Sequence, residues 1–258
     1  MTKYRSKFLY KNLIDDEAEF ALSSGNNAAN RTKLIDGKED NLCYAIGEGG
    51  AMTLTWTPGA ATTVSRIILQ GINWKTFTVK YNTNVNFSDA ISEAANAYTD
   101  RLYEVTSQAV NDIVFTITAP ITAGQEIRTG QIIVSTEIYE VASTVACNIL
   151  SASNSDQIEM FRMSDGTFQK VFDREITNYD ISYLAVSQAE KANFMTVFDT
   201  NKYDRVIFIP RPRDGSDQWD GKCNHYNIAN MQRDMFTRNV EYNGYDVHIQ
   251  LKQASGLG

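Results

Sequence analysis

Short runs in which hydrophobic residues alternate with small or polar ones constrain the fold of this chain more than any other feature. The alternation is strict at 51–56, at 77–81 and at 244–251. Successive side chains of a strand point to opposite faces, so a period of two predicts strands with one buried side. Apolar, β-branched runs at 64–69 and 113–118, with turn residues between them, add further strands. We therefore expect antiparallel sheets and not alternating strands and helices.

Two segments are predicted as helices. Residues 87–97 contain helix formers behind Ser88, a candidate N-cap, and would form a short helix within a loop. Ser187 and Glu190 form an S-x-x-E capping box at the start of the second segment, 187–198. Apolar residues at spacings i, i+3 and i+4 give this helix one stripe that we expect to pack on a sheet: Phe194, Val197 and Phe198.

The pattern changes near the middle of the chain. Residues 141–156 are rich in Ser, Ala and Asn and their periodicity lapses, so we place a domain boundary near residue 150. Beyond it, 157–172 has the pattern of a hairpin with an Asp-Gly turn at 165–166. The sequence thus predicts a mainly β protein with two parts: an antiparallel β-sandwich over 1–150 and a smaller α+β domain over 151–258.

Composition excludes several classes of partner. The 258 residues carry 24 Lys and Arg against 31 Asp and Glu, a formal net charge of −7. A nucleic-acid-binding surface needs a surplus of cations, so we expect no nucleic acid. No stretch approaches the roughly 18 apolar residues of a membrane span, and residues 1–20 lack the apolar core of a signal peptide. We expect no membrane insertion and a protein made in the cytoplasm with its cysteines reduced: Cys43, Cys147 and Cys223.

No catalytic or metal-binding motif is recognisable. Cys223 and His225 stand two positions apart in a loop, a spacing that fixes no geometry between thiol and imidazole, and zinc would need further ligands. The loop 214–221 has carboxylates at every third position, whereas a calcium loop needs ligands at alternate positions. His248 lies on the polar side of the last alternating run and is expected to be exposed. We therefore expect no enzyme activity, no metal and no cofactor.

Five fragments stand in the order in which one known family carries them: 30–37 (NRTKLIDG), 52–56 (MTLTW), 63–69 (TVSRIIL), 73–81 (NWKTFTVKY) and 125–134 (QEIRTGQIIV). Through them, the stretch from about 28 to 139 resembles the discoidin, or coagulation factor F5/8 type C, family. The resemblance implies a galactose-binding-like jelly-roll sandwich whose rim, near the DG turn, binds ligand or structural calcium in many members. The chain departs from the family at 41–44, where NLCY replaces S/T-x-W, and it lacks the family's terminal disulfide pair.

The combination of this sandwich with an α+β domain ending in GYDVHIQLK is similar to structural proteins of bacteriophage tails. Residues 181–198 and 206–210 resemble a helix-bearing segment and the strand after it in such proteins. This similarity implies a tail-tip, baseplate or collar subunit of a virion, assembled in the host cytoplasm from copies of itself and other tail proteins. Two alternatives stay open: a carbohydrate-binding module for a bacterial surface glycan and, ranked last, a cell-wall hydrolase.

Glycan binding and assembly would each use a different set of residues. A glycan would bind at the rim of the sandwich, where aromatic rings stack on sugars and polar groups hold the hydroxyls; the candidates are Asp36, Asp40, Tyr44 and Trp74. Assembly would use aromatic residues near loops as interface anchors; the candidates are Tyr179, Tyr183, Trp219 and Tyr226. For every aromatic among them, filling of the hydrophobic core is the alternative.

Overall fold

The structure is a computed structural model. It describes residues 7–9, 12–23, 27–36, 42–44, 51–136, 138–141, 146–162, 168–200, 206–209, 224–228, 236–239 and 244–253. These residues form a mainly β protein with antiparallel sheets, as the alternating patterns predict. None of the described helices combines the length and the hydropathy needed to cross a bilayer.

The chain forms two compact units. The first comprises Met1–Ile138 and Phe208–Cys223, and the second comprises Tyr139–Ile207 and Asn224–Gly258. The boundary predicted near residue 150 falls inside a strand of the second unit, β13 (Ala146–Arg162). The short strand β1 (Lys7–Leu9) belongs to the first unit. The chain passes from one unit to the other within two further short strands, β12 (Ile138–Glu140) and β15 (Val206–Ile209).

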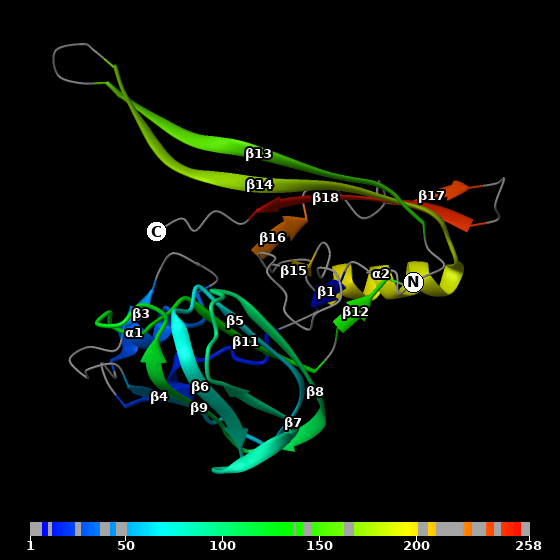
Figure 1. Ribbon diagram of the computed structural model, residues 1–258. Coiled ribbons are helices and arrows are strands. Elements are labelled where there is room, and N and C mark those ends of the chain that lie inside the picture. The colour runs from blue at the N-terminus through cyan, green and yellow to red at the C-terminus, as the bar shows by residue number, and fades with distance from the viewer. Residues whose placement is uncertain are drawn as a thin grey trace. The chain divides into compact units, whose positions relative to one another are not determined.

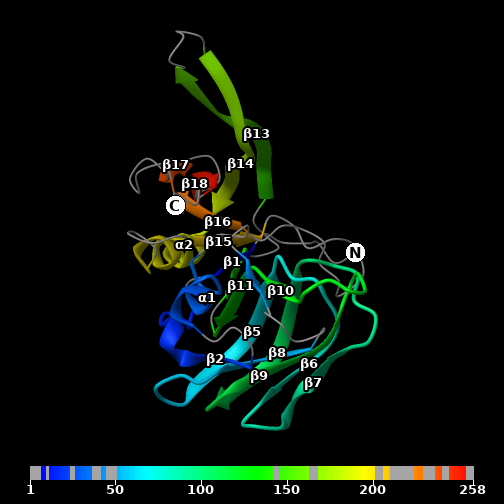
Figure 2. The ribbon, with the colours of Figure 1, turned by 90° about the vertical axis from the view of Figure 1, so that its left-hand side faces the viewer.

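The first unit is a β-sandwich of a five-stranded and a three-stranded sheet (Figure 1 and Figure 2). The strand orders are β2-β4-β9-β6-β7 and β11-β5-β8. The five-stranded sheet contains β2 (Phe20–Leu22), β4 (Met52–Trp56), β6 (Trp74–Tyr81), β7 (Val85–Glu93) and β9 (Ile113–Pro120). The three-stranded sheet contains β5 (Thr62–Gln70), β8 (Arg101–Val110) and β11 (Gln131–Ser135). Four shorter elements complete the unit: η1 (Glu17–Glu19), α1 (Ala28–Thr32), β3 (Cys43–Tyr44) and β10 (Arg128–Thr129).

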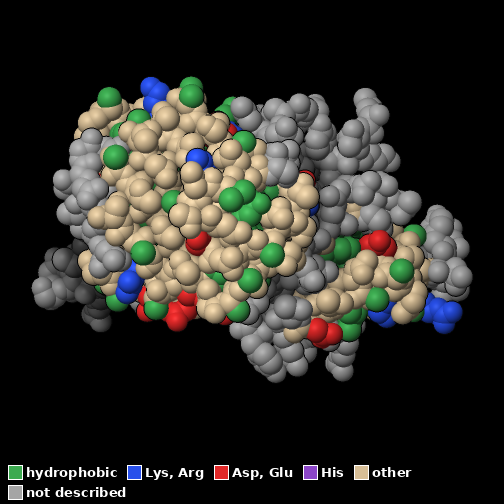
Figure 3. All heavy atoms as spheres, turned by 90° about the horizontal axis from the view of Figure 1, so that it is seen from below, with side chains coloured by type: hydrophobic (Ala, Val, Ile, Leu, Met, Phe, Trp, Pro, Cys, Tyr) green, Lys and Arg blue, Asp and Glu red, His purple; other side chains and the backbone are tan. Residues whose placement is uncertain are grey.

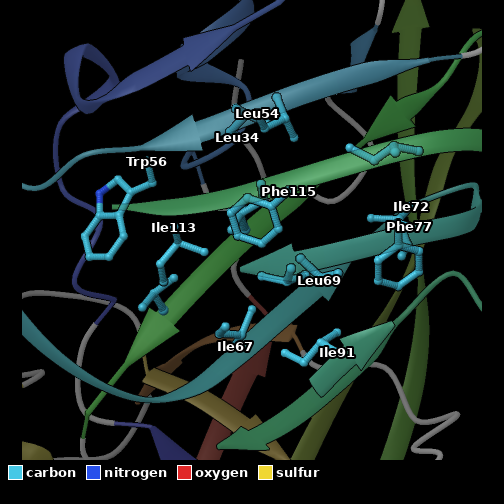
Figure 4. Close-up of a cluster of buried hydrophobic side chains, with 14 of the residues drawn as sticks. Leu34, Leu54, Trp56, Ile67, Leu69, Ile72, Phe77, Ile91, Ile113 and Phe115 are labelled. Carbon is cyan, nitrogen blue, oxygen red and sulfur yellow. The ribbon is translucent and has the colours of Figure 1, made fainter. Parts of the chain in front are cut away.

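The alternating residues of both sheets meet in one hydrophobic core (Figure 4). Strand β4 buries every second residue, and β9, its antiparallel neighbour, does the same. The two large indoles of the core each keep a hydrogen bond: Trp56 Nε1 donates to Glu19 Oε2 at 2.8 Å and Trp74 Nε1 donates to Thr129 Oγ1 at 3.1 Å. A buried indole N–H without such an acceptor would destabilise the fold.

The helix predicted at 87–97 is wrong, because most of that segment is strand β7. Its residues pair with β6 in an antiparallel register that includes Phe77 with Glu93 and Val79 with Ile91. Phe87 and Ile91 are buried in the core, four positions apart. That spacing fits one face of a helix and, equally, one face of a strand, and pairing with β6 overrides the local preference of the Ala-rich sequence.

The second unit contains β13, β14 (Phe168–Val186), α2 (Gln188–Thr200), β16 (Asn224–Ile228), β17 (Phe236–Asn239) and β18 (Gly244–Gln253). Strand β18 pairs with β14 on one edge and with β16 and β17 on the other, while β13 pairs with β14. The predicted hairpin is therefore confirmed, although its turn at 165–166 lies outside the described residues.

The predicted helix at 187–198 is also confirmed. The Glu190 N–H donates to Ser187 Oγ at 3.1 Å, which is the N-cap bond that the S-x-x-E pattern predicts. The Phe194 ring packs against Tyr139 and Tyr183, with centroids 4.9 and 5.3 Å apart. The whole predicted stripe is buried: Phe194, Val197 and Phe198.

Candidate functional site

The two ends of the sandwich differ in how the strands are connected. At one end β5, β7 and β9 finish and β6, β8 and β10 begin, joined by the segments 71–73, 94–100 and 121–127. The β3–β10 ladder lies next to these connections, and the chain between β2 and β3 contains α1. We call this the loop end. The opposite, turn end is made by the shorter connections at 82–84 and 111–112 and by 57–61.

Asn73 ties two connections of the loop end together. Its side chain, 3% exposed, donates from Nδ2 to the Glu126 carbonyl and accepts at Oδ1 from the Arg128 backbone N–H, both at 2.8 Å. Its backbone N–H donates to the Arg128 carbonyl, and its carbonyl accepts from the Ile121 N–H. One buried amide thus fixes the path of the chain into β10.

Asn96 and Asp100 fix the connection between β7 and β8 in a similar way. Asn96 Nδ2 donates to the carbonyls of Trp74 and Tyr98, at 2.7 and 2.8 Å. Asp100 Oδ1 accepts from the Gly71 N–H at 3.1 Å. Both side chains are buried, so the network consists of satisfied polar groups that hold loop backbone rather than groups that face solvent.

The segment between α1 and β3 is anchored to the sheets by two buried amides. Asn30 Nδ2 donates to the Tyr44 carbonyl at 3.2 Å. Gln131 Nε2 donates to the Lys33 carbonyl at 2.9 Å and to Asp36 Oδ1 at 2.8 Å. These bonds hold β3 and the turn after α1 through their backbone and through Asp36. The Tyr44 side chain takes no part in them and is exposed.

Tyr44 and Arg128 are directly opposite each other in the β3–β10 ladder. Residues opposite each other in an antiparallel pair share a face, with Cβ atoms about 4.5–5.5 Å apart. Tyr44 is 37% exposed and is the only aromatic residue that is exposed among those the structure describes. Arg128 is half-buried, and its Nε is buried without a hydrogen-bond partner. The exposed Tyr44 ring and the Arg128 side chain therefore start from adjacent positions on the same face of the ladder.

Two other arginines of the first unit form ion pairs within the chain. Arg66 Nε lies 3.4 Å from Glu104 Oε1. Arg101 pairs with Glu93, donates from Nε to the Tyr103 hydroxyl at 3.0 Å, and lies over the Tyr103 ring at 5.2 Å from its centroid. Burial raises the pKa of the Tyr103 hydroxyl, so this group stays neutral beside the pair. The Arg101 cluster is thus a closed structural ion pair.

The four residues predicted to bind a glycan at the rim differ in their exposure. Tyr44 is exposed at the loop end, and Asp36 is half-buried with one oxygen held by Gln131. Trp74 is fully buried against Phe77 and Phe115, so it offers no ring face to a ligand and the prediction for this residue is wrong. Asp40 lies outside the described residues.

The four interface candidates also differ. Tyr183 is buried under α2 against Phe194, so it is a core residue and not an exposed anchor. Tyr179 is half-buried on β14. Tyr226 belongs to β16, where it pairs with Gln253, and its side chain is outside the described set, as is the whole of Trp219.

A Ser–His–Asp cluster in the second unit escaped the sequence analysis. Ser182 Oγ lies 3.0 Å from His248 Nδ1, and His248 Nε2 lies 3.4 Å from Asp180 Oδ1. Antiparallel pairing of β14 with β18 brings Ser182 opposite His248, a relation that residues far apart in sequence do not reveal. His248 is exposed, as predicted, and the cluster lies on β14 and β18 at partly or fully exposed positions. A catalytic cluster of this kind also needs hydrogen-bond donors that hold an oxyanion. Within the described ranges no group of three or more His, Cys, Asp or Glu residues could hold a metal ion.

No protein-family model matches the chain, and no curated protein matches it. Solved structures that are similar include chitosan-binding module 1 from the chitosanase/glucanase of Paenibacillus sp. IK-5 (14% identity, 45% of this chain and 93% of that chain, TM-score 0.39). Two others are CpGH89CBM32-5 from Clostridium perfringens in complex with GalNAc-beta-1,3-galactose (13%, 46% and 97%, 0.38) and a putative alpha-L-fucosidase from Bacteroides thetaiotaomicron (11%, 49% and 29%, 0.41).

These neighbours are carbohydrate-binding modules and one putative glycosidase, matched at low identity over about half of this chain. With every TM-score below 0.5, they identify no ligand for this chain. The predicted similarity to phage tail proteins has no support in the comparisons.

Proposed function

We propose that the first unit is a non-catalytic binding module that takes a sugar ring at the loop end, with Tyr44 as the stacking surface. One observation carries this proposal: the exposed aromatic ring of Tyr44 lies on a ladder that is fixed by buried amides. Aromatic faces bind the apolar face of sugar rings, and polar neighbours hold the hydroxyls. The resemblance of 28–139 to galactose-binding-like domains favours the same class of ligand.

The construction of the loop end supports a preformed site. Asn30 holds the Tyr44 carbonyl, and Asn73 holds the Arg128 N–H, so both strands of the ladder are positioned by side chains from other segments. A site that is ordered before binding loses less conformational entropy when the ligand arrives. On the face of the first unit that Figure 3 shows, the described hydrophobic side chains form small, separate spots, so that face offers no broad hydrophobic contact surface.

The test is a glycan array followed by calorimetry with the full chain. We expect Tyr44→Ala to abolish or strongly weaken binding of any sugar that the wild type selects. Val85→Ala is the matched control, because Val85 is an exposed large hydrophobic residue (46%) at the turn end. Equal binding by wild type and Tyr44→Ala, with both proteins folded by circular dichroism, would exclude the proposed site.

A second candidate function is assembly into a larger particle, with other copies or other virion tail proteins as partners. The specific observation is the β13–β14 ribbon: in the part of the chain that the structure describes, β18 pairs with 179–186 of β14, whereas β13 pairs with β14 as far as Arg162 and Phe168. The remaining part is a two-stranded ribbon, which is marginally stable on its own and has edges that can pair with another chain. Figure 1 shows this ribbon running past the end of β18.

Native mass spectrometry of the full chain at micromolar concentration tests the second candidate. We expect a defined oligomer for the wild type, and a monomer when 158–172 is replaced by a short Gly-Ser turn that keeps the pairing of β14 with β18. A wild-type monomer at every concentration would count against self-assembly through the ribbon.

A further inference from the structure

Among the residues that the structure describes, Arg128, which lies opposite Tyr44 in the ladder, has no counter-ion. Arg66 and Arg101 are paired with Glu104 and Glu93, but none of the residues the structure describes forms an ion pair or a side-chain hydrogen bond with the Arg128 guanidinium. Its Nε is buried without a hydrogen-bond partner, as are those of Arg31 and Arg66. Arg128 differs from these two because Arg66 has an ion pair with Glu104 and Arg31 donates to the Phe20 carbonyl. A half-buried guanidinium in this state gains free energy from any acceptor that reaches it.

We infer that the ligand of the loop end is an acidic sugar, whose carboxylate binds Arg128 while its ring stacks on Tyr44; this inference rests on the proposed function. The guanidinium presents a planar fork of donors that matches the two oxygens of a carboxylate. Because Arg128 and Tyr44 are directly opposite in the ladder, one ligand ring can contact both side chains.

Two other charged side chains near the ladder, Lys33 and Asp36, already have hydrogen-bond partners in the protein, so we assign binding of the carboxylate to Arg128. Lys33 Nζ donates to the Leu42 carbonyl at 3.2 Å, and Asp36 accepts from Gln131, so both groups are engaged by the protein. Lys33 also lies close enough to act electrostatically on Cys43, the residue before Tyr44.

The first experiment compares matched acidic and neutral sugars with the wild-type chain. The probes are a galacturonic acid trisaccharide against the neutral galactose trisaccharide, and 3′-sialyllactose against lactose, which distinguish a uronic from a sialic carboxylate. A charged hydrogen bond contributes about 1.5–3 kcal/mol, so we expect the acidic member of at least one pair to bind about 10- to 100-fold more tightly. Equal affinity for the members of both pairs would overturn the inference and leave the proposed function standing.

The second experiment uses Arg128→Gln, which removes the charge and keeps a side chain of moderate length. We expect this variant to lose the preference for the acidic sugar while its affinity for the neutral one changes less than threefold. Arg66→Gln removes the same charge at the Glu104 pair and is the control for a general electrostatic effect. Tyr44→Ala is expected to weaken both sugars together. If Arg128→Gln still binds the acidic sugar more tightly than the neutral one, another residue binds the carboxylate and the inference fails.

Discussion

Replacing Asn73 tests whether the loop end is held by buried amides. In Asn73→Ala, the Glu126 carbonyl loses the donor at 2.8 Å and the Arg128 N–H loses the acceptor at 2.8 Å. Both bonds are partly buried, so each backbone group left without a partner costs an amount near the lower end of about 1–3 kcal/mol. Two such groups therefore lower the free energy of unfolding of the first unit by at least about 2 kcal/mol. For a unit of this size, that corresponds to a fall in Tm of at least about 4 °C.

Tryptophan fluorescence during thermal unfolding follows this unit, because Trp56 and Trp74 are both buried in it. The control is Asn84→Ala at the turn end, where the side chain accepts one exposed hydrogen bond from Lys80 Nζ. A surface substitution of this kind changes stability by less than about 0.5 kcal/mol. The same samples are then titrated with the sugar that the wild type binds.

We expect Asn73→Ala to weaken sugar binding at a temperature where it is still folded, because the Arg128 backbone is no longer fixed on its inner side. Asn84→Ala is expected to bind as the wild type does. The reasoning is refuted if Asn73→Ala melts within 1 °C of the wild type, or if it melts lower yet binds with unchanged affinity. The second result would show that the loop end keeps its shape without this amide.

Three further predictions concern single side chains. Ser187→Ala removes the N-cap of α2 and should lower the free energy of unfolding of the second unit by about 1 kcal/mol in urea titrations, whereas Ser187→Asp should retain it. Glu93→Ala leaves the Arg101 charge buried and unpaired and should destabilise the first unit by about 3 kcal/mol; the double variant with Arg101→Met should recover most of that loss in the same melts. Burial raises the pKa of the Cys43 thiol from 9.0 to about 12, against a lowering by Lys33. The fold therefore favours the neutral thiol, and the stability that Cys43 contributes is present below pH 9 and declines as the pH rises toward 12. In a Cys147→Ser, Cys223→Ser background, native Cys43 should react with iodoacetamide at pH 8 about a thousandfold more slowly than the unfolded chain, as followed by mass spectrometry.

Strand and helix signals that lie within one element were predictable from the sequence. The alternation of Met52, Leu54 and Trp56 specifies the buried side of β4, and the Ser187–Glu190 pattern specifies the start of α2. The segment at 87–97 was not predictable, because its Ala-rich composition favours a helix and only pairing with β6 decides for a strand.

Relations between distant segments account for what was missed at the candidate site. Tyr44 was nominated because it follows a motif, but Arg128 becomes its neighbour only through the β3–β10 register. Trp74 was nominated as an aromatic residue at the rim, and its burial depends on how two sheets close over Phe77 and Phe115. Asn73 carries no sequence signal for its role, since an Asn beside a strand is also a common turn residue.

The loop end separates the groups that hold backbone from the groups that face solvent. Asn73, Asn96 and Gln131 are buried and make hydrogen bonds to the chain itself, whereas the Tyr44 ring is exposed and makes no hydrogen bond or ring contact with any residue that the structure describes. Substituting Tyr44 should therefore change binding with little effect on Tm, and substituting the buried amides should change Tm first. This separation also makes ligand choice adjustable, because a different residue at 44 or 128 would meet the same fixed backbone. A scaffold of that kind suits a module that selects its ligand by surface side chains and leaves the ligand chemically unchanged.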